Sequence, residues 1–399
     1  MHATIPTPAR VVPSDEQLKW LALRMTPGLG TRTAVQLLVH FQSPEAIFRA
    51  SITELEVAGV SSAVARNLST GFGFEDALIQ QRKLAERGAV LIPYSSSSYP
   101  PRLKEIYDPP PMLFARGRVE ILDTLCIAIV GTRRPTAYGT AATTRLAKDL
   151  ADAGLTITSG MARGIDTAAH KAALETSGST IAVFGCGVDE LYPTENRKLS
   201  EQIAERGLIL SDFPMGTPPY PQNFPMRNRI ISGLSAGVLI VEGGEYSGSA
   251  ITARLAADHG REVFAVPGNI TSKMSYAPNL LIKQGAKLVQ DWNDIITEIK
   301  PEDRRWLASD FRKRLNLNEN GAGESDEGGE ASLDIGPMTG LGRVVLNVLK
   351  LDAAVQLDNL VETLAPNSAS EIIATLFELE LQGLIRQLPG KSYLRVWGD

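Results

Sequence analysis

The stretch CIAIVGTRRPTAYGTAATTRLAKDLADAGLTITSG, residues 126–160, contains the repeating unit of this chain. An apolar, β-rich run ends in glycine, a helical segment follows, and a second apolar run ends in serine and glycine. Similar runs recur downstream, with helical segments between them, at TIAVFG (180–185), LILSDF (208–213), GVLIVEG (237–243) and EVFAVPG (262–268). Strands that alternate with helices predict an α/β fold with a Rossmann-like, doubly wound and mostly parallel sheet.

The regions outside this repeat have different patterns. Residues 1–16 are expected to form a flexible tail. Residues 17–75 show helical spacing on both sides of PGLG (27–30), which predicts a SAM-like or helix-hairpin-helix-like module. Such a turn can offer backbone N–H groups to a phosphate, or it can simply join two packed helices. Residues 76–300 then form the extended Rossmann-like domain.

The C-terminal third divides into two parts. Residues 301–336 are polar, acidic and glycine-rich, and 318–335 hold six acids and no base, so a flexible linker is expected. Residues 337–399 show three amphipathic helical segments followed by IRQLPGKSYLRV, which reads as a hairpin. Three helices and a hairpin predict a winged-helix domain.

Composition limits the possible functions. The chain has 399 residues and a net charge of −5, and it has no apolar run long enough to span a membrane, so a cytoplasmic protein is expected. Its two cysteines and four histidines lack ligand spacing, so we expect no metal. The first glycine loop is neither G-x-G-x-x-G nor a P-loop, so we expect no cofactor. Residues 126–290 carry 16 Lys and Arg against 14 Asp and Glu, which permits a local basic groove.

Ligands of such sheets bind beyond the carboxyl ends of the strands, so the loops there supply the candidate site. These loops offer glycine backbone, hydroxyl groups and arginines, which suit phosphate oxygens. Asp166 is expected to cap the helix after the second strand. The loop candidates are Gly131, Thr132, Arg133, Ser159, Gly160, Arg163, Gly164, Lys171, Ser247, Gly248 and Ser249.

The segment FPMRNRIISGLS, residues 224–235, adds Phe224, Arg227, Asn228 and Arg229 to the candidates. Phe224 could stack on an unpaired base. The two arginines are two positions apart, so on a helix they face nearly opposite sides. One is expected to meet phosphate and the other to hold a neighbouring loop, while a purely structural role for the whole group is the alternative. Asn228 is expected to bond to backbone at the start of the helix.

Catalytic machinery is missing from these loops: they contain no nucleophile–base pair, no convincing acid–base pair and no metal-ligand set. The candidate edge therefore predicts a protein that binds a polyanion and is not an enzyme.

The ordered motifs YPPRLKEIYDPPPMLFARG, IAIVGTRRPTAYG, SGMARGIDTAAHKAAL, FPMRNRIISGLS and SGSAITARLAADHGREVFAVPG resemble those of the DNA-processing protein A (DprA/Smf) family. The resemblance covers about residues 99–289. Two positions depart from the family pattern: Ala277 stands where a glycine is expected, and Asp212 where glutamate is usual.

This resemblance implies binding and protection of single-stranded DNA, and loading of the RecA recombinase onto that strand in natural transformation. It also implies a homodimer formed through the Rossmann-like domain.

Two other functions stay open. Rossmann-like nucleotide phosphoribohydrolases bind phosphate at a similar loop, but Thr252 stands where their catalytic glutamate would lie. A transcription regulator would use the winged helix, but its third helical segment carries three glutamates and no base, which suits DNA phosphates poorly.

Overall fold

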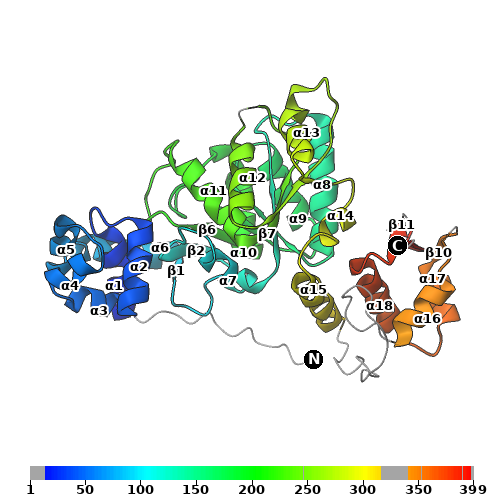
Figure 1. The fold of residues 1–399 in the computed structure, drawn as a ribbon, viewed down its shortest axis with the longest axis horizontal. Coiled ribbons are helices and arrows are strands. Elements are labelled where there is room, and N and C mark those ends of the chain that lie inside the picture. Colours follow the sequence, from blue (N-terminus) through cyan, green and yellow to red (C-terminus); the bar gives the residue numbers. More distant parts are fainter. Residues whose placement is uncertain (1–13, 246, 316–339, 352, 389, 397–399) are drawn as a thin grey trace. The chain divides into compact units, whose positions relative to one another are not determined.

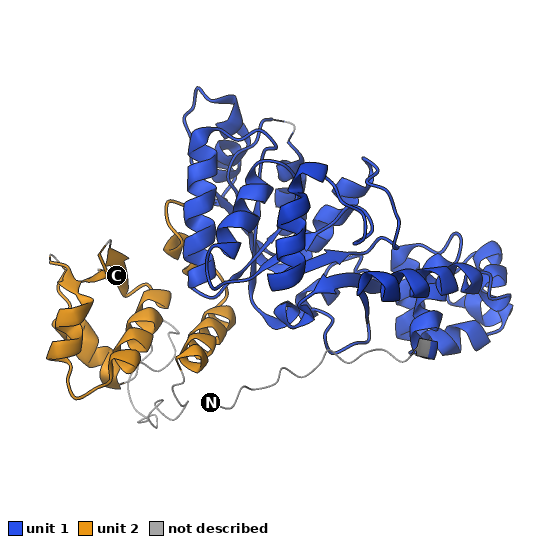
Figure 2. Cartoon of the chain, turned by 180° about the vertical axis from the view of Figure 1, so that it is seen from behind, with its two compact units in different colours: residues 1–288 blue, residues 289–399 orange. Residues whose placement is uncertain are grey.

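The computed structural model describes residues 14–245, 247–315, 340–351, 353–388 and 390–396. The chain divides into two compact units, residues 1–288 and residues 289–399 (Figure 2). Each unit has its own hydrophobic core. Across the residues that the structure describes, no helix combines the length and the apolar character that crossing a membrane requires.

A nine-stranded sheet, in the order β1-β2-β6-β5-β4-β3-β7-β8-β9, organises the described part of the first unit (Figure 1). Strands β3 to β9 pair in parallel, which confirms the expected fold class. Strands β1 and β2 extend one edge in antiparallel pairing, and the apolar repeat did not predict them. The strands are β1 (Val90–Pro93), β2 (Met112–Gly117), β3 (Cys126–Val130), β4 (Thr156–Ser159), β5 (Thr180–Val183), β6 (Leu208–Ser211), β7 (Ser235–Ile240), β8 (Glu262–Ala265) and β9 (Lys287–Leu288).

Helices cover both faces of this sheet, because the central strands are apolar on both sides. On β5, Ala182 packs into one core cluster with residues of α10, and its neighbours Ile181 and Val183 pack into another with residues of α11 and α12. The helices of this region are α7 (Pro101–Lys104), α8 (Ala137–Asp152), α9 (Ile165–Leu174), α10 (Arg197–Arg206), α11 (Asn223–Leu234), α12 (Gly248–Asp258) and α13 (Tyr276–Lys283). Short 3-10 helices are η1 (Val119–Asp123), η2 (Thr194–Asn196) and η3 (Lys273–Ser275).

The strand order reverses at β3, which has β4 on one side and β7 on the other. The chain runs outward from β3 to β6 and then returns through α11 to β7. Loops that follow β3, β4 and β7 therefore meet at one edge of the sheet, where doubly wound folds bind their ligands.

From residue 14 onward, six helices precede the sheet: α1 (Ser14–Met25), α2 (Thr31–Phe41), α3 (Pro44–Arg49), α4 (Ile52–Val57), α5 (Ser62–Ser69) and α6 (Phe74–Arg87). Serine N-caps start three of them, because the side chains of Ser43, Ser51 and Ser61 accept hydrogen bonds from backbone N–H groups of the first turn. Their apolar residues join the first core cluster of the sheet unit.

The second unit contains α14 (Asn293–Ile296), α15 (Pro301–Arg314), α16 (Gly340–Val348), α17 (Leu357–Thr363) and α18 (Ala369–Leu381). Strands β10 (Val355–Gln356), β11 (Ile385–Leu388) and β12 (Ser392–Arg395) form a small antiparallel sheet. Three helices with this sheet make the expected winged helix.

The linker expected over residues 301–336 was wrong for residues 301–314, which form α15. Pro301 at the start, two acids in the first turn and three bases in the last turn all favour a helix. The acidic stretch 318–335 lies outside the described residues.

Candidate nucleic-acid interface

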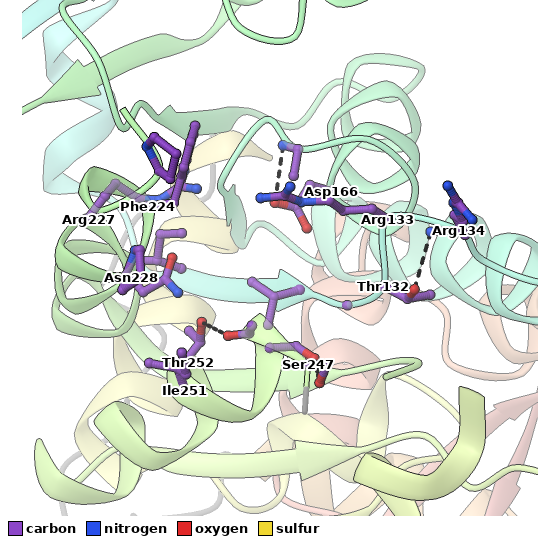
Figure 3. A pocket seen from close by; sticks show the side chains of 18 of the residues that line it. Thr132, Arg133, Arg134, Asp166, Phe224, Arg227, Asn228, Ser247, Ile251 and Thr252 are labelled. Atoms are coloured by element: carbon purple, nitrogen blue, oxygen red, sulfur yellow. Dashed lines mark hydrogen bonds between the residues drawn. The ribbon is translucent and has the colours of Figure 1, made fainter. Parts of the chain in front are cut away.

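A cavity of about 610 Å³ lies at the edge where the strand order reverses. Figure 3 shows its labelled side chains: those of α11 on one side and those of the loop after β3 on the other. Of the residues predicted from sequence, the cavity brings together Gly131, Thr132, Arg133, Phe224, Arg227, Asn228, Ser247, Gly248 and Ser249. These residues come from three separate segments of the chain, which only the fold unites.

Residues 131–136, here called the arginine loop, are held in place by Glu242 at the end of β7. The Thr132 N–H donates to the Glu242 carbonyl at 2.7 Å, and the Thr136 N–H and hydroxyl donate to the Glu242 carboxylate at 2.9 and 2.6 Å. A Cβ at Gly139 would overlap that carboxylate, so a glycine is required there. With the backbone fixed, the exposed guanidinium groups of Arg133 and Arg134 can reach toward a ligand.

Phe224 lies in the first turn of α11 and is half-buried at the wall of the cavity. Its ring centroid is 5.3 Å from that of Tyr192, and the Arg133 guanidinium lies 5.7 Å from the Phe224 centroid. An aromatic ring beside a guanidinium suits both the flat face of a base and the phosphate next to it.

Arg227 is buried, and its Nη1 donates to the carbonyls of Gly160, at 2.7 Å, and Val183. Burial lowers the pKa of Arg227 to about 10, so the group still carries its charge at neutral pH. Nearby, Asp166 accepts hydrogen bonds from the backbone N–H groups of Gly160 and Ala162. Burial raises the pKa of Asp166, and the Arg227 charge opposes that rise.

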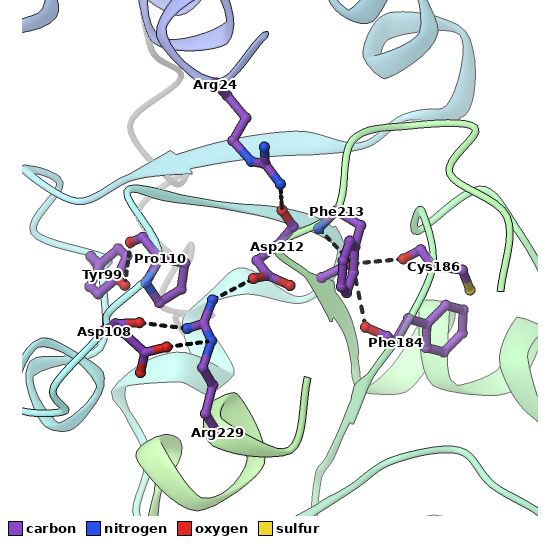
Figure 4. A network of polar contacts seen from close by, with 10 residues as sticks. Arg24, Tyr99, Asp108, Pro110, Phe184, Cys186, Asp212, Phe213 and Arg229 are labelled. Carbon is purple, nitrogen blue, oxygen red and sulfur yellow. Dashed lines mark hydrogen bonds and ion pairs between the residues drawn. The ribbon is translucent and has the colours of Figure 1, made fainter. Parts of the chain in front are cut away.

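Arg229 does not line the cavity, and its guanidinium points toward Asp108 and Asp212 (Figure 4). Its Nη2 donates to Asp212 Oδ2 at 2.6 Å, and its Nη1 donates to the Asp108 carbonyl at 2.7 Å. A 3.3 Å ion pair with the Asp108 carboxylate completes the set. Arg229 is therefore the arginine that holds neighbouring loops.

The third wall of the cavity follows β7. Ser247 precedes α12 and Ser249 lies in its first turn, with their hydroxyl oxygens 2.8 Å apart. Thr252, one turn further on, is buried against this wall.

Sequence analysis did not single out Tyr192, Pro219 and Pro221, which also line the cavity. Tyr192 lies in the loop GCGVDELYP (185–193) and the two prolines lie in the segment before α11, and neither loop contains any of the arginines on which the site prediction rested.

Several predicted residues lie away from the cavity. Ser159 is fully buried, and its hydroxyl donates to the Ile129 carbonyl at 2.6 Å, so this hydroxyl does not face the cavity. The Gly160 N–H is likewise occupied by Asp166. Asp166 does not cap α9, because the helix begins at Ile165 with Gly164 in the cap position.

The remaining residues of the second loop point elsewhere. Arg163 pairs with Glu195 on the surface, Gly164 packs against the arginine loop, and Lys171 is exposed on α9. Asn228 lies in the second turn of α11 on the cavity wall, rather than at the helix start where a backbone bond was expected. Within the described parts of the chain, His, Cys, Asp and Glu side chains form no group that could hold a metal.

Comparison with known proteins agrees with this architecture. A family model described as DNA recombination-mediator protein A matches residues 90–300, and one described as DprA winged helix domain matches residues 336–391. Protein Smf of Synechocystis sp. is 34% identical over 96% of this chain and 99% of its own length. DNA processing protein DprA of Bacillus subtilis is 47% identical over 54% of this chain and 72% of its own length.

A solved structure is also similar. The X-ray structure of DNA processing protein A from Streptococcus pneumoniae has a TM-score of 0.64 and 33% identity, and the match covers 73% of this chain and 99% of that one. Because the first family model spans more than half of the sequence, and one relative matches along almost its whole length, the chain belongs to the DprA/Smf family of DNA-processing proteins.

Proposed function

We propose that the cavity between the arginine loop and α11 binds single-stranded DNA. The observation that carries this proposal is the meeting of exposed Arg133 and Arg134 with the Phe224 ring at one cavity. Guanidinium groups bind phosphates whatever the sequence, and an aromatic face accepts any unpaired base. Together they suit a single strand better than a duplex, whose bases are already stacked.

The hydroxyl groups of Ser247 and Ser249 support the same ligand. They lie at the N-terminal end of α12, where the helix dipole favours a phosphate. The buried Arg227 adds a positive charge behind Phe224, and a charge removed from water acts over a longer distance than an exposed one.

We further propose that the chain protects incoming single-stranded DNA and loads RecA onto it, in the cytoplasm and as a homodimer. The family description, DNA recombination-mediator protein A, supports this step, because a mediator must hand its strand to a recombinase. A dimer would hold two such cavities and would bind one strand more tightly than a single cavity does.

Fluorescence anisotropy with labelled single-stranded and duplex oligonucleotides, at several salt concentrations, tests the ligand class. We expect tighter binding to the single strand, little sequence preference, and affinity that falls as salt rises. Equal or tighter binding to duplex at the same salt would contradict the proposal.

RecA loading is tested on single-stranded DNA coated with single-strand binding protein, with ATP hydrolysis by RecA as the signal. We expect the chain to shorten the lag before hydrolysis, and the Arg133→Ala variant to do so less. An unchanged lag, with DNA binding intact, would restrict the function to protection. Sedimentation measurements at several protein concentrations test the dimer.

A further inference from the structure

The N-terminal helices hold the segment that leads into the candidate site. Residues 212–222, here called the proline segment, run from the end of β6 to the start of α11. On α6, the Gln80 side chain is buried and pairs with the backbone of Met215 in two directions. Its Nε2 donates to the Met215 carbonyl at 3.1 Å, and its Oε1 accepts from the Met215 N–H at 2.8 Å.

A second contact from the N-terminal helices lies at the beginning of the same segment. Arg24, in the last turn of α1, donates from Nη2 to the Asp212 carbonyl at 3.3 Å (Figure 4). The Asp212 carboxylate in turn accepts from Arg229 of α11. Two helices of the N-terminal group thus hold the backbone of the proline segment at two points, three residues apart.

Apolar packing accompanies these hydrogen bonds. Trp20 of α1 and Leu84 of α6 belong to the same core cluster as Met215 and Phe184. The N-terminal helices and this edge of the sheet therefore share one core, so α6 has a fixed place against Met215.

The rest of the proline segment connects the fixed backbone of Met215 to the cavity. The Gly216 N–H donates to Asp189 Oδ1 at 2.8 Å, and the Gly187 N–H donates to the Thr217 carbonyl at 2.9 Å. Beyond these bonds, Pro219 and Pro221 line the cavity, and Phe224 follows in the first turn of α11. Prolines transmit position well, because their rings fix one backbone angle.

We propose that the N-terminal helices are a positioning element of the DNA site, and that Gln80 is the positioning residue that sets the place of Pro219, Pro221 and Phe224. This inference rests on the proposed function, in that the cavity takes single-stranded DNA. The helices act through the proline segment, with no contact of their own to the strand. Gln80 contributes no charge to the DNA, so its loss should change affinity without changing the number of phosphates neutralised.

The test compares Gln80→Met and Gln80→Glu with the parent chain. The methionine variant keeps the side-chain length and loses both hydrogen bonds. A buried carboxylate loses the bond to the Met215 carbonyl while it is charged, but its protonated form can again donate and accept. Gln81→Met is the matched control, because Gln81 lies on the same helix and bonds to Gln17 of α1.

Hydrogen exchange and DNA binding are measured on each full-length protein. In Gln80→Met we expect faster exchange in residues 212–224, unchanged exchange in β3 to β5, and at least fivefold weaker binding to single-stranded DNA with an unchanged salt dependence. In Gln80→Glu we expect the same loss at pH 8 and recovery toward the parent's affinity as the pH falls to 5.5. Gln81→Met should match the parent.

Different failures have different meanings. A parent chain that does not bind single-stranded DNA would overturn the proposed function and, with it, this inference. If the parent binds, faster exchange in residues 212–224 with unchanged affinity would overturn the positioning role alone. A general loss of stability, in proportion to affinity and with no recovery of Gln80→Glu at low pH, would also overturn it, because Gln80 would then serve only the core.

Discussion

Arg227 and Arg229 lie two positions apart on α11, but their side chains have different hydrogen-bond and ion-pair partners. Arg229 meets two carboxylate groups and a carbonyl, which neutralise and hold it. Arg227 bonds to two carbonyl groups, and the nearby Asp166 carboxyl acts on its buried charge from beside the same cavity. Two identical side chains thus have different surroundings: Arg229 pairs with carboxylates of neighbouring loops, and Arg227 bonds to backbone carbonyl groups beside the cavity.

At the residue scale, Arg133→Ala should weaken single-strand binding and flatten its salt dependence. Each phosphate contact that is lost lowers the slope of log affinity against log salt by about 0.7 for a single strand. Anisotropy titrations at four salt concentrations measure that slope. Arg145→Ala is the matched control, since Arg145 is exposed on α8 and pairs with Asp149. Full affinity and an unchanged slope for Arg133→Ala would identify Arg133 as an ordinary surface charge.

Phe224→Ala should weaken binding by about 1–3 kcal/mol, the range for one stacked base, and leave the salt slope unchanged. The ring is half-buried against Tyr192, so truncation also removes packing. Phe224→Leu separates the two effects, because leucine keeps apolar bulk and lacks the aromatic face. We expect Phe224→Leu to bind nearly as weakly as Phe224→Ala with a melting temperature close to the parent's. Affinity that follows melting temperature across both variants would instead indicate a packing role.

At the scale of elements, α18 carries three acidic residues and no basic residue that could pair with a DNA phosphate. Its three glutamates all have partners inside the second unit. Glu371 completes the capping box with Ser368, Glu378 pairs with Arg312 of α15 at 2.8 Å, and Glu380 accepts from the Gln387 N–H at 2.9 Å. The Phe311 and Phe377 rings stack with centroids 4.1 Å apart, so α15 packs against the helix that winged-helix DNA readers use.

Glu380 makes the stability of the second unit depend on pH. Burial raises the pKa of Glu380 to about 7 from its ordinary 4.5, against the opposing hydrogen bond from Gln387. The stability that the neutral form contributes is complete below pH 4.5 and is lost as the pH rises through 7, by an amount on the order of 3 kcal/mol. Glu380→Gln stays neutral, so we expect its C-terminal transition to melt several degrees higher than the parent's at pH 8 and equally at pH 4.5.

Calorimetry at the two pH values measures this difference. Because the glutamine amide oxygen can still accept from Gln387, the variant keeps the hydrogen bond and removes only the charge. Equal pH dependence of the C-terminal transition in both proteins would show that Glu380 titrates at its ordinary pKa.

At the scale of the whole molecule, the boundary between the two compact units lies after Leu288 and not at the acidic segment 318–335. Sequence composition favoured a cut near residue 300, but α14 and α15 belong to the second unit, so such a cut divides it. A chain that ends at Leu288 should keep most single-strand affinity, because every residue of the candidate site lies in the first unit. Anisotropy of both chains, with sedimentation to compare their oligomeric state, checks this. A folded, equally dimeric chain that loses tenfold in affinity would make the winged helix a DNA-binding element.

The sequence by itself determined the parallel strands β3 to β8, the crossover helices between them and the winged helix, but not the two-residue parallel strand β9. Apolar runs bounded by glycine are local signals, because a strand that is buried on both faces consists almost entirely of apolar residues. The same local signals marked the arginine loop, Phe224 and the serines at the start of α12, because glycine, charge and aromatic residues concentrate there.

Only the tertiary structure decided which of those residues share a cavity. Ser159 and Gly160 belong to a loop that looks suited to phosphate, yet Ile129 and Asp166 occupy their polar groups. Arg229 does not line the cavity, because Asp108 and Asp212, far apart in sequence, both bond to its guanidinium. The hydrogen bond from Gln80 to Met215 joins residues 135 positions apart, and no nearby sequence pattern predicts it. Such contacts depend on how distant segments pack, and periodicity along the chain contains no record of that packing.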